Sequence, residues 1–450
     1  MSIGLGAGSR RVILVVVDQA VSSAINFGVA LFVAQAVSAS QFGAFAIAFA
    51  LYLVFLGIGR SCAGSPLTIR FSTASQRRWR AATAASCGCA LLVGIASGVL
   101  VAGVGALAAP LSPAVAQCLS ALALALPPLL VQDHWRFAFF ARGRPAQSVI
   151  IDLVWAAVLS LAFLLLSLRA DTQAWLVIAA WGFAAAVAAA VGGALAGTPA
   201  HLSQGLAWLR EHRDLAPSLV GEFILSSGIS QAVALSVGLI AGLGAAGALR
   251  GAQVLFGPVN VLLLAAGSLA VPEGARLRKR GERALRIGMV SVSVAASVVA
   301  LSWGLLLTLA VPDSLGLWLL GDTWGPAAKV VPPLAILMAA TGAASGALAG
   351  LRVVEQPNRI FRLRALASPL LLLGGLAGAI VASAPGSVWG QSMPMMLLSV
   401  AWWLEFRDAS RGTMPRHASS GHTTRGAVFS RLGSPDSPST AKHNSYHDSE

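Results

Sequence analysis

The first strongly apolar segment of the chain carries a stripe of polar residues. Asp18, Ser22 and Asn26 are spaced i, i+4 and i+8, so they share one face of a helix. A charge in the middle of a membrane costs about 2.5–3.5 kcal/mol on insertion scales, so a carboxylate there needs a partner or a water-filled cavity. We therefore expect Asp18, Ser22 and Asn26 to face a polar cavity, where they could bind a cation or a proton or line the path of a cargo.

A second stripe of the same kind lies about halfway along the chain. Glu222, Ser226 and Ser230 repeat the i, i+4, i+8 spacing. An acid in the first turns of a helix is also favoured by the helix dipole, which gives Glu222 a purely structural alternative. We predict that Glu222, Ser226 and Ser230 line the same cavity as the first stripe.

Arg250 lies in a part of the chain where basic residues are otherwise scarce. Gln253, Gly257 and Asn260 follow it at i+3, i+7 and i+10, which on a continuous helix extends one polar face. A guanidinium group offers planar paired donors that suit a phosphate or a pyrophosphate. We predict that Arg250, Gln253 and Asn260 line a cavity for a phosphorylated cargo.

Two further arginines lie near predicted helix ends. Arg60 closes the second apolar segment, and Arg136 lies at the end of the fourth. Both could contact the cargo, or both could extend to lipid headgroups at the membrane surface. Lys329 and Asp152 are secondary candidates for the same cavity.

The elements that must position these residues are long apolar helices. The 450 residues are 56% hydrophobic and 11% charged, with a mean hydropathy of +0.77. One membrane crossing needs ~20 apolar helical residues, and that pattern recurs about twelve times. The fold class is therefore an all-α polytopic membrane protein. The predicted spans are 12–37, 42–62, 81–107, 114–140, 147–168, 174–196, 218–241, 246–270, 287–311, 326–350, 365–383 and 388–406.

The basic residues predict the orientation of these spans. If the N-terminus is cytoplasmic, all but three of the 31 basic residues fall on the cytoplasmic side. The exceptions are Arg169, Arg250 and Lys329. We therefore predict that both termini are cytoplasmic, and that the net charge of +14 reflects this placement and not a nucleic-acid partner.

The chain contains an internal repeat. A shift of 204 residues aligns Asp18–Leu51 with Glu222–Leu255 without a gap, and a shift of 205 lays Pro127-Pro128 on Pro332-Pro333. Six spans return the chain to the side that it left, so the two halves have the same orientation. This predicts two pseudo-symmetric six-helix lobes, a parallel repeat of the kind found in transporters that bind cargo between their halves.

These patterns divide the chain into five parts. A helix over His201–Leu215, with Leu202, Leu206 and Leu209 on one side, is predicted to lie on the membrane surface between the lobes. The segment after residue 406 is rich in serine, proline and charge, which is typical of disorder. The predicted parts are a cytoplasmic N-terminus (1–11), an N-terminal lobe (12–196), a cytoplasmic linker helix (197–217), a C-terminal lobe (218–406) and a disordered cytoplasmic tail (407–450).

The signatures of catalysis are missing from the sequence. No G-x-x-x-x-G-K-[ST] loop and no G-x-S-x-G turn occurs, so neither an ATPase nor a serine hydrolase is indicated. The four cysteines lie within or at the ends of spans, without the spacing of a disulfide framework or a metal site. We therefore predict a protein that is not an enzyme and that uses no cofactor and no metal.

Several motifs resemble those of a known family. They are Asp18–Phe27, Gln41–Ala46, Trp135–Phe137, Ala141–Pro145 and Gly321–Ala327. They are similar to motifs of polysaccharide-export flippases, the O-antigen-flippase-like branch of the multidrug/oligosaccharidyl-lipid/polysaccharide exporter superfamily. The resemblance covers about residues 10–406 and excludes the tail.

The resemblance implies two six-helix lobes around a central cavity and export of lipid-linked oligosaccharides from the inner leaflet by alternating access. It also implies a multi-pass protein of the bacterial cytoplasmic membrane. Its partners would be membrane lipids, a pyrophosphate-linked oligosaccharide lipid as cargo, and polysaccharide-assembly proteins. Basic cavity residues of the family meet the lipid pyrophosphate, and Arg250 and Arg60 are the positions that could match that role here.

Alternative functions predict different sensitive residues. A peptidoglycan-precursor flippase would have the same needs as a polysaccharide flippase. A drug or cation antiporter of the same fold would depend on Asp18 and Glu222, whereas a flippase for a pyrophosphate lipid would depend on Arg250. A membrane scaffold without transport activity would tolerate all three changes and lose function on truncation at Arg407.

Overall fold

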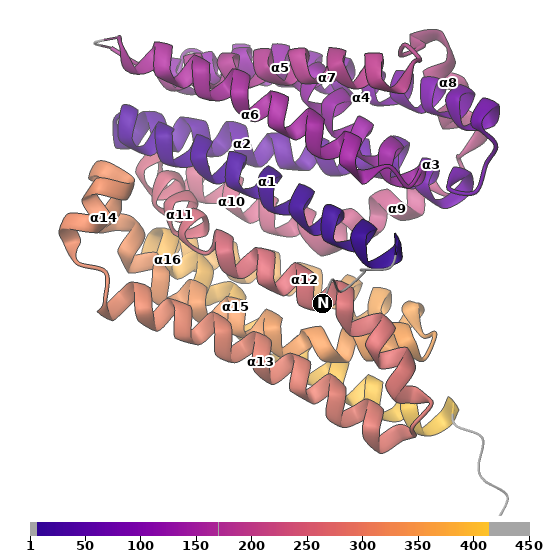
Figure 1. The fold of residues 1–450 in the computed structure, drawn as a ribbon. Helices are drawn as coiled ribbons and strands as arrows, with labels where there is room; N and C mark the ends of the chain where they lie inside the picture. Colours follow the sequence, from indigo (N-terminus) through magenta and orange to yellow (C-terminus); the bar gives the residue numbers. More distant parts are fainter. Residues whose placement is uncertain (1–6, 170, 414–450) are drawn as a thin grey trace, which may run out of the picture. The chain divides into compact units, whose positions relative to one another are not determined.

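The structure is a computed structural model that describes the backbone of residues 7–169 and 171–413. Side chains are described from residue 21 to residue 411, apart from 170, 264, 265, 268 and 357. These described residues form helices and connecting turns, with no strand among them (Figure 1). The α-helices are α1 (Ala7–Ala36), α2 (Ala39–Gly59), α3 (Ser65–Phe71), α4 (Gln76–Ala108), α5 (Pro113–Ala141), α6 (Pro145–Ser167), α7 (Ala174–Ala196), α8 (Leu202–Glu211), α9 (Ala216–Phe223), α10 (Ile229–Ala241), α11 (Leu243–Leu255), α12 (Gly257–Arg278), α13 (Glu282–Leu309), α14 (Asp313–Leu320), α15 (Trp324–Val353) and α16 (Pro357–Thr413).

Most of these helices are long and apolar enough to cross a membrane. Within the described part of the chain, nine helical segments meet that standard, and a tenth is added if the bent pair α11 and α12 forms one span. The all-α membrane fold is therefore confirmed, while the total of twelve spans stays a prediction. Segment 358–411 counts once among the nine, and α1 is not among them because its fully described part, Val21–Ala36, is shorter than one crossing.

Helix α16 is two antiparallel helices joined without a loop. The backbone leaves helical geometry at Ala382 and Ser383, where Ser383 has a φ of 55°. Glycines let the two arms approach closely on either side of this turn: a Cβ on Gly378 would lie 2.0 Å from the carbonyl oxygen of Gly386. A hairpin at this position agrees with the predicted boundary between spans 365–383 and 388–406.

Capping residues explain several helix ends. Ser38 begins α2 by accepting a hydrogen bond from the backbone N–H of Gln41, and Ser112 begins α5 in the same way with Val115. Helix α7 ends at Gly197, whose φ of 63° is the left-handed conformation that glycine adopts without strain. These local signals fix where the long apolar helices begin and end.

The packing of the first six long helices recurs in the second six. In the first half, α4 and α7 pack along α5, and α1 packs on α6. In the second half, α13 and the C-terminal arm of α16 pack along α15, and α10 packs on α16 (Figure 1). Both central helices carry the aligned double prolines, Pro127-Pro128 in α5 and Pro332-Pro333 in α15. This pattern is what a duplicated six-helix unit predicts.

Helix α2 of the first half and α11 of the second half cross at Gly43 and Gly247, two glycines that the shift of 204 residues aligns. A Cβ on Gly43 of α2 would lie 1.9 Å from the carbonyl oxygen of Leu243 in α11. A Cβ on Gly247 would lie 3.3 Å from the carbonyl oxygen of Ala39. Only residues without side chains permit this approach, so α2 and α11 are in backbone contact at their N-terminal ends.

Enlarging Gly43 to valine should separate α2 from α11 at this crossing. An ordinary carbon contact is about 3.5 Å, so the helices must move apart by roughly 1.5 Å or more to admit a Cβ. The measurement is the distance between spin labels at Ser40 and Gly244, both exposed, in a variant lacking the native cysteines. The matched control is Gly103→Val, which meets open space and should leave the distance unchanged. An unchanged distance in Gly43→Val would contradict the close crossing.

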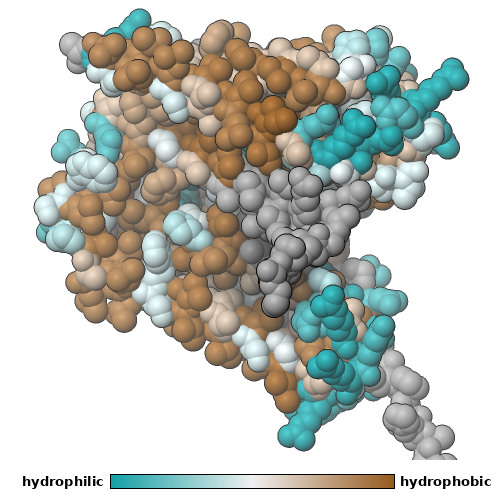
Figure 2. Space-filling model, viewed as in Figure 1, coloured by the Kyte–Doolittle hydropathy of each residue, from teal (hydrophilic) through white to brown (hydrophobic). Residues whose placement is uncertain are grey.

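Hydrophilic residues concentrate at the end of the helices that lies away from the crossing of Gly43 and Gly247. Figure 2 shows them where α3 and α8 lie and where α12 passes into α13, while apolar residues cover most of the remaining face. The basic segments 70–80 and 276–286 belong to these regions. We refer to this as the arginine-rich end. It agrees with the basic side predicted from the sequence, whose cytoplasmic location stays a prediction.

Three predicted boundaries differ from the structure. The second span was expected to end at residue 62, but its helix continues through a π-helical turn (Arg60–Gly64) to Phe71. The predicted surface helix is shorter, as α8, and it packs on α4 by burying Trp208 while Leu202 and Leu206 stay exposed. Residues 407–413 were expected in the tail but are helical, and the rest of the tail lies outside the described residues.

Candidate functional site

Four charged residues form an ion-pair cluster in the first half of the chain; three of them are buried and the fourth, Arg60, is half-buried. Arg60 donates from Nε to Asp133 Oδ2 at 2.8 Å and from Nη2 to Asp133 Oδ1 at 2.7 Å. Arg136 reaches Asp133 at 3.3 Å and Asp152 at 3.5 Å. Two acids and two arginines from α5, α6 and the π-helical turn after α2 therefore balance one another, which is how proteins make buried charge tolerable.

Neutral polar groups complete this ion-pair cluster. Gln132 donates to Asp152 Oδ1 at 2.9 Å, and Arg136 donates to Ser22 Oγ at 3.3 Å. Next to them, His134 Nε2 and Ser86 Oγ share a hydrogen bond of 3.0 Å. Asn26 is half-buried and donates to the backbone carbonyl of Ser22 at 2.9 Å. The side chain of Asp18, predicted on the same face, lies outside the described residues.

The ion-pair cluster changes the interpretation of Arg60 and Arg136. Arg136 is 6% exposed, so its side chain does not extend to lipid headgroups. Arg60 lies inside a continuous helical segment and not at its end, and its side chain is 40% exposed although both of its hydrogen bonds go to Asp133. Both arginines are engaged with carboxylates of the same chain, which leaves less positive charge for a cargo.

Arg250 differs from these arginines because no described side chain neutralises it. Its Cζ lies 3.7 Å from the centre of the Phe49 ring, and its Nε is buried without a hydrogen-bond partner. A small cavity of about 20 Å³ adjoins it, lined also by Gln231, Gln253 and Leu53. Arg250 thus lies where α2 and α10 meet α11, about one turn beyond the glycine crossing.

The polar stripe that begins at Arg250 is broken. Helix α11 ends at Leu255 and α12 begins at Gly257, with a bend of 53° between them. The predicted continuous face therefore stops after Gln253, which lines the same small cavity as Arg250. Asn260 is half-buried on the other side of the bend. Gly257-Pro258 marks this break in the sequence, because a proline inside a helical pattern ends or kinks the helix, and the predicted continuous stripe did not take it into account.

The second predicted stripe lies on an open face. Glu222, Ser226 and Ser230 are exposed, and a π-helical turn (Ile224–Gly228) interrupts their helix. Glu222 lines a cavity of about 430 Å³ at the arginine-rich end, together with Arg352 and Arg364. The structure therefore brings Glu222 close to positive charge from the ends of α15 and α16, a neighbourhood that the stripe alone did not predict.

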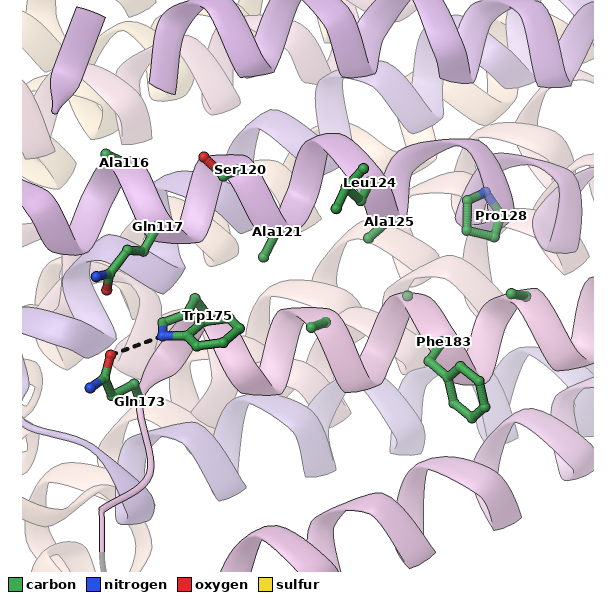
Figure 3. A pocket seen from close by; sticks show the side chains of 13 residues that line it. Ala116, Gln117, Ser120, Ala121, Leu124, Ala125, Pro128, Gln173, Trp175 and Phe183 are labelled. Atoms are coloured by element: carbon green, nitrogen blue, oxygen red, sulfur yellow. Dashed lines mark hydrogen bonds between the residues drawn. The ribbon is translucent and has the colours of Figure 1, made fainter. Parts of the chain in front are cut away.

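A larger cavity of about 770 Å³ contains no charged residue. It lies between α5 and α7, and Figure 3 shows Leu124 and Phe183 along its wall. Gln173 accepts a hydrogen bond from Trp175 Nε1 at 2.9 Å near one end. Because Leu124 is 82% exposed and Phe183 is 64% exposed, this cavity opens to the hydrocarbon side of the helices and is unsuited to a charged cargo.

Sequence reasoning missed several residues that complete these sites. Asp133 neutralises Arg60 across 73 residues of sequence, and only its i, i+3 spacing from Arg136 hinted at an ion pair. Phe49 and Gln231 surround Arg250 but occur in ordinary apolar segments. Lys329, a secondary candidate, is exposed, whereas Asp152 is 0% exposed and belongs to the ion-pair cluster.

Comparisons with known proteins give no match by sequence. No protein family matches the chain, and no curated protein matches it either. Solved structures match by fold. An inward-facing multidrug resistance MATE family transporter of the MOP superfamily aligns with a TM-score of 0.66 at 11% identity, covering 86% of this chain and 94% of that one.

Two further solved structures share this fold. The lipid II flippase MurJ in an inward closed conformation gives a TM-score of 0.65 at 10% identity, covering 89% of this chain and 90% of that one. An outward-facing MATE family transporter gives 0.53 at 14% identity, covering 90% and 96%. The chain is a multi-pass helical membrane protein with the fold of the MOP superfamily transporters.

Proposed function

We propose that this chain is a transporter that moves a lipid-linked oligosaccharide, held through its phosphate or pyrophosphate, from one leaflet to the other by alternating access. The proposal includes two six-helix lobes, 12–196 and 218–406, with the cargo bound between them. It places the protein in a bacterial cytoplasmic membrane with both termini inside, where it would work with polysaccharide-assembly proteins.

The observation that supports this cargo is Arg250, which no described side chain neutralises. A cation inside the membrane costs about 2.5–3.5 kcal/mol on insertion scales. Stacking on an aromatic ring returns about 1–2 kcal/mol, so Phe49 offsets only part of that cost. An anionic cargo would supply the missing counter-charge. The cavity of about 20 Å³ cannot hold a pyrophosphate, so the cargo would reach Arg250 only after the two lobes move apart during transport.

A second candidate, a cation-coupled antiporter, is supported by the ion-pair cluster. Asp133 and Asp152 are buried acids, the residue type that binds a coupling proton or cation in membrane proteins. Both face arginines, however, so cation binding would have to displace an existing ion pair. The fold itself suits either function, since one MATE family transporter matches it with a TM-score of 0.66 and the lipid II flippase with 0.65.

Deletion of the gene followed by extraction of lipid-linked sugars tests the proposal in cells. If the chain is a flippase of this type, lipid-linked sugars accumulate in the inner leaflet and the amount of polymer at the cell surface decreases. Complementation with the intact chain should reverse both changes. Unchanged lipid pools, combined with increased sensitivity to cationic drugs, would favour the antiporter instead.

A further inference from the structure

The cavity beside Glu222 is separate from the site at Arg250. Its lining comes from α9, the C-terminal end of α15 and the N-terminal end of α16, all in the second half of the chain. Its volume of about 430 Å³ falls in the range of small-molecule sites, which is roughly 300–1,000 Å³. It therefore has room for a phosphate group together with part of the molecule that carries it.

The charge of this cavity is positive on balance. Arg352 and Arg364 contribute two guanidinium groups, and Glu222 contributes one carboxylate. Among the described residues, neither arginine forms an ion pair within 4.0 Å, although Arg359, on the same helical segment as Arg364, pairs with Glu405. The Cζ of Arg364 lies 5.8 Å from the centre of the Trp402 ring, which restricts the position of its side chain.

The neighbouring groups provide hydrogen-bond donors and an apolar wall. Asn358 and Ser218 line the cavity beside the arginines, and an amide and a hydroxyl can each donate to a phosphate oxygen. Leu225, Ile360 and Phe361 form the apolar part of the lining. Phe361 is 50% exposed, so this wall continues into the surface that hydrocarbon would cover.

We propose that this cavity binds the phosphate headgroup of an anionic membrane lipid at the arginine-rich end of the second half. Arg352 and Arg364, which form no ion pair with the described residues, form paired hydrogen bonds to phosphate oxygens, and the apolar wall receives the start of the lipid chains. Glu222 opposes the bound anion by like-charge repulsion, which keeps binding weak enough for the lipid to exchange. The proposal does not depend on Arg250 or on what the transporter carries.

Binding of short-chain lipids to the purified full-length protein tests this site. The probes are phosphatidylglycerol and phosphatidylcholine with the same chains, and inorganic pyrophosphate as a competitor. We expect phosphatidylglycerol to bind more tightly than phosphatidylcholine. The double variant Arg352→Gln/Arg364→Gln should weaken that binding at least about tenfold, since one such charged contact is worth about 1.5–3 kcal/mol.

Two further variants make the result specific to the site. Glu222→Gln should tighten phosphatidylglycerol binding about threefold, because like-charge repulsion is lost. Arg362→Gln removes the same charge from an exposed position outside the cavity lining and should leave binding unchanged. If Arg364→Gln fails to fold, Arg364→Lys with Arg352→Gln keeps a cation over Trp402 and should still weaken binding.

Three outcomes would overturn the proposal. The first is equal phosphatidylglycerol binding by the wild type and the double variant. The second is equal binding of phosphatidylcholine and phosphatidylglycerol. The third is competition by pyrophosphate at the same concentration as the lipid, which would assign the site to a soluble phosphate compound. None of these readouts measures transport, so they leave the proposed function to its own test.

Discussion

Replacing Asp133 by asparagine is expected to lower the free energy of unfolding by about 3–5 kcal/mol, the cost of breaking a buried ion pair from one side. Asp133 accepts both hydrogen bonds from Arg60 and a third from Arg136. The neutral amide would take one carboxylate from the buried Arg136 and leave the half-buried Arg60 without its counter-charge. Reversible unfolding in mixed micelles, followed by circular dichroism, measures the change.

Two comparisons separate this effect from a general loss of negative charge. Asp408→Asn removes an exposed carboxylate, 63% accessible at its side chain, and should cost less than about 1 kcal/mol. The double variant Arg60→Gln/Asp133→Asn should be more stable than Asp133→Asn alone, because the unpaired charge is gone. If Asp133→Asn lowers the free energy of unfolding by less than about 1 kcal/mol, the ion-pair cluster does not stabilise the packing of α5 against the π-helical turn after α2.

Replacing Arg250 by glutamine is expected to reduce transport of a pyrophosphate-linked lipid roughly 100-fold, because loss of a paired charged contact costs about 3 kcal/mol. Glutamine keeps hydrogen-bond donors but removes the charge and the planar pair of N–H groups. Folding should be retained, since Arg250 forms no ion pair with any described side chain. Translocation in proteoliposomes, followed as quenching of a fluorescent lipid, measures the rate.

The control variants distinguish the charge from its geometry. Arg250→Lys keeps the charge without the planar fork and should give an intermediate rate. Arg169→Gln removes another of the few basic residues predicted on the outer side, at an exposed position after α6, and should transport normally. Equal rates for Arg250→Gln and the wild type would remove Arg250 from the cargo site.

The sequence predicted the fold well because the membrane imposes a strong pattern. Runs of ~20 apolar residues and the placement of arginines depend only on the chemistry of the bilayer, so they can be read without knowing any contact. The repeat could also be found in the sequence, because matching polar positions and double prolines are rare among alanine-rich helices. The alignment of Gly43 with Gly247 did not predict that the two glycines lie where α2 contacts α11, which only the structure shows.

The site was predicted only in part because its contacts are long-range. Arg136 was assigned either to cargo or to lipid headgroups, and no local pattern showed that Asp152 would neutralise it. The stripe from Arg250 to Asn260 assumed one continuous helix, but the 53° bend after Leu255 divides it. Arg352 and Arg364 were counted only as basic residues of one membrane side. Their shared cavity with Glu222 depends on how α9 meets α16, which sequence spacing does not encode.

The arrangement of charges bears on which function the chain performs. In the ion-pair cluster, Arg60 and Arg136 are held by Asp133 and Asp152, so these acids are less free to bind a coupling cation. Arg250 has no such partner among the described residues. A cavity with an unpaired cation suits an anionic cargo, whereas a drug and cation antiporter would gain more from an unpaired acid. This contrast is the physical basis for preferring a phosphorylated lipid.

Translocation by the purified wild-type protein in proteoliposomes separates recognition of a pyrophosphate-linked lipid from the alternative functions. Two fluorescent polyisoprenyl lipids are compared, one with a pyrophosphate-linked sugar and one with a neutral headgroup. We expect the protein to accelerate movement of the pyrophosphate-linked lipid between leaflets and to leave the neutral lipid unaffected. Equal movement of both lipids, or uptake of an organic cation with no movement of either, would contradict this expectation.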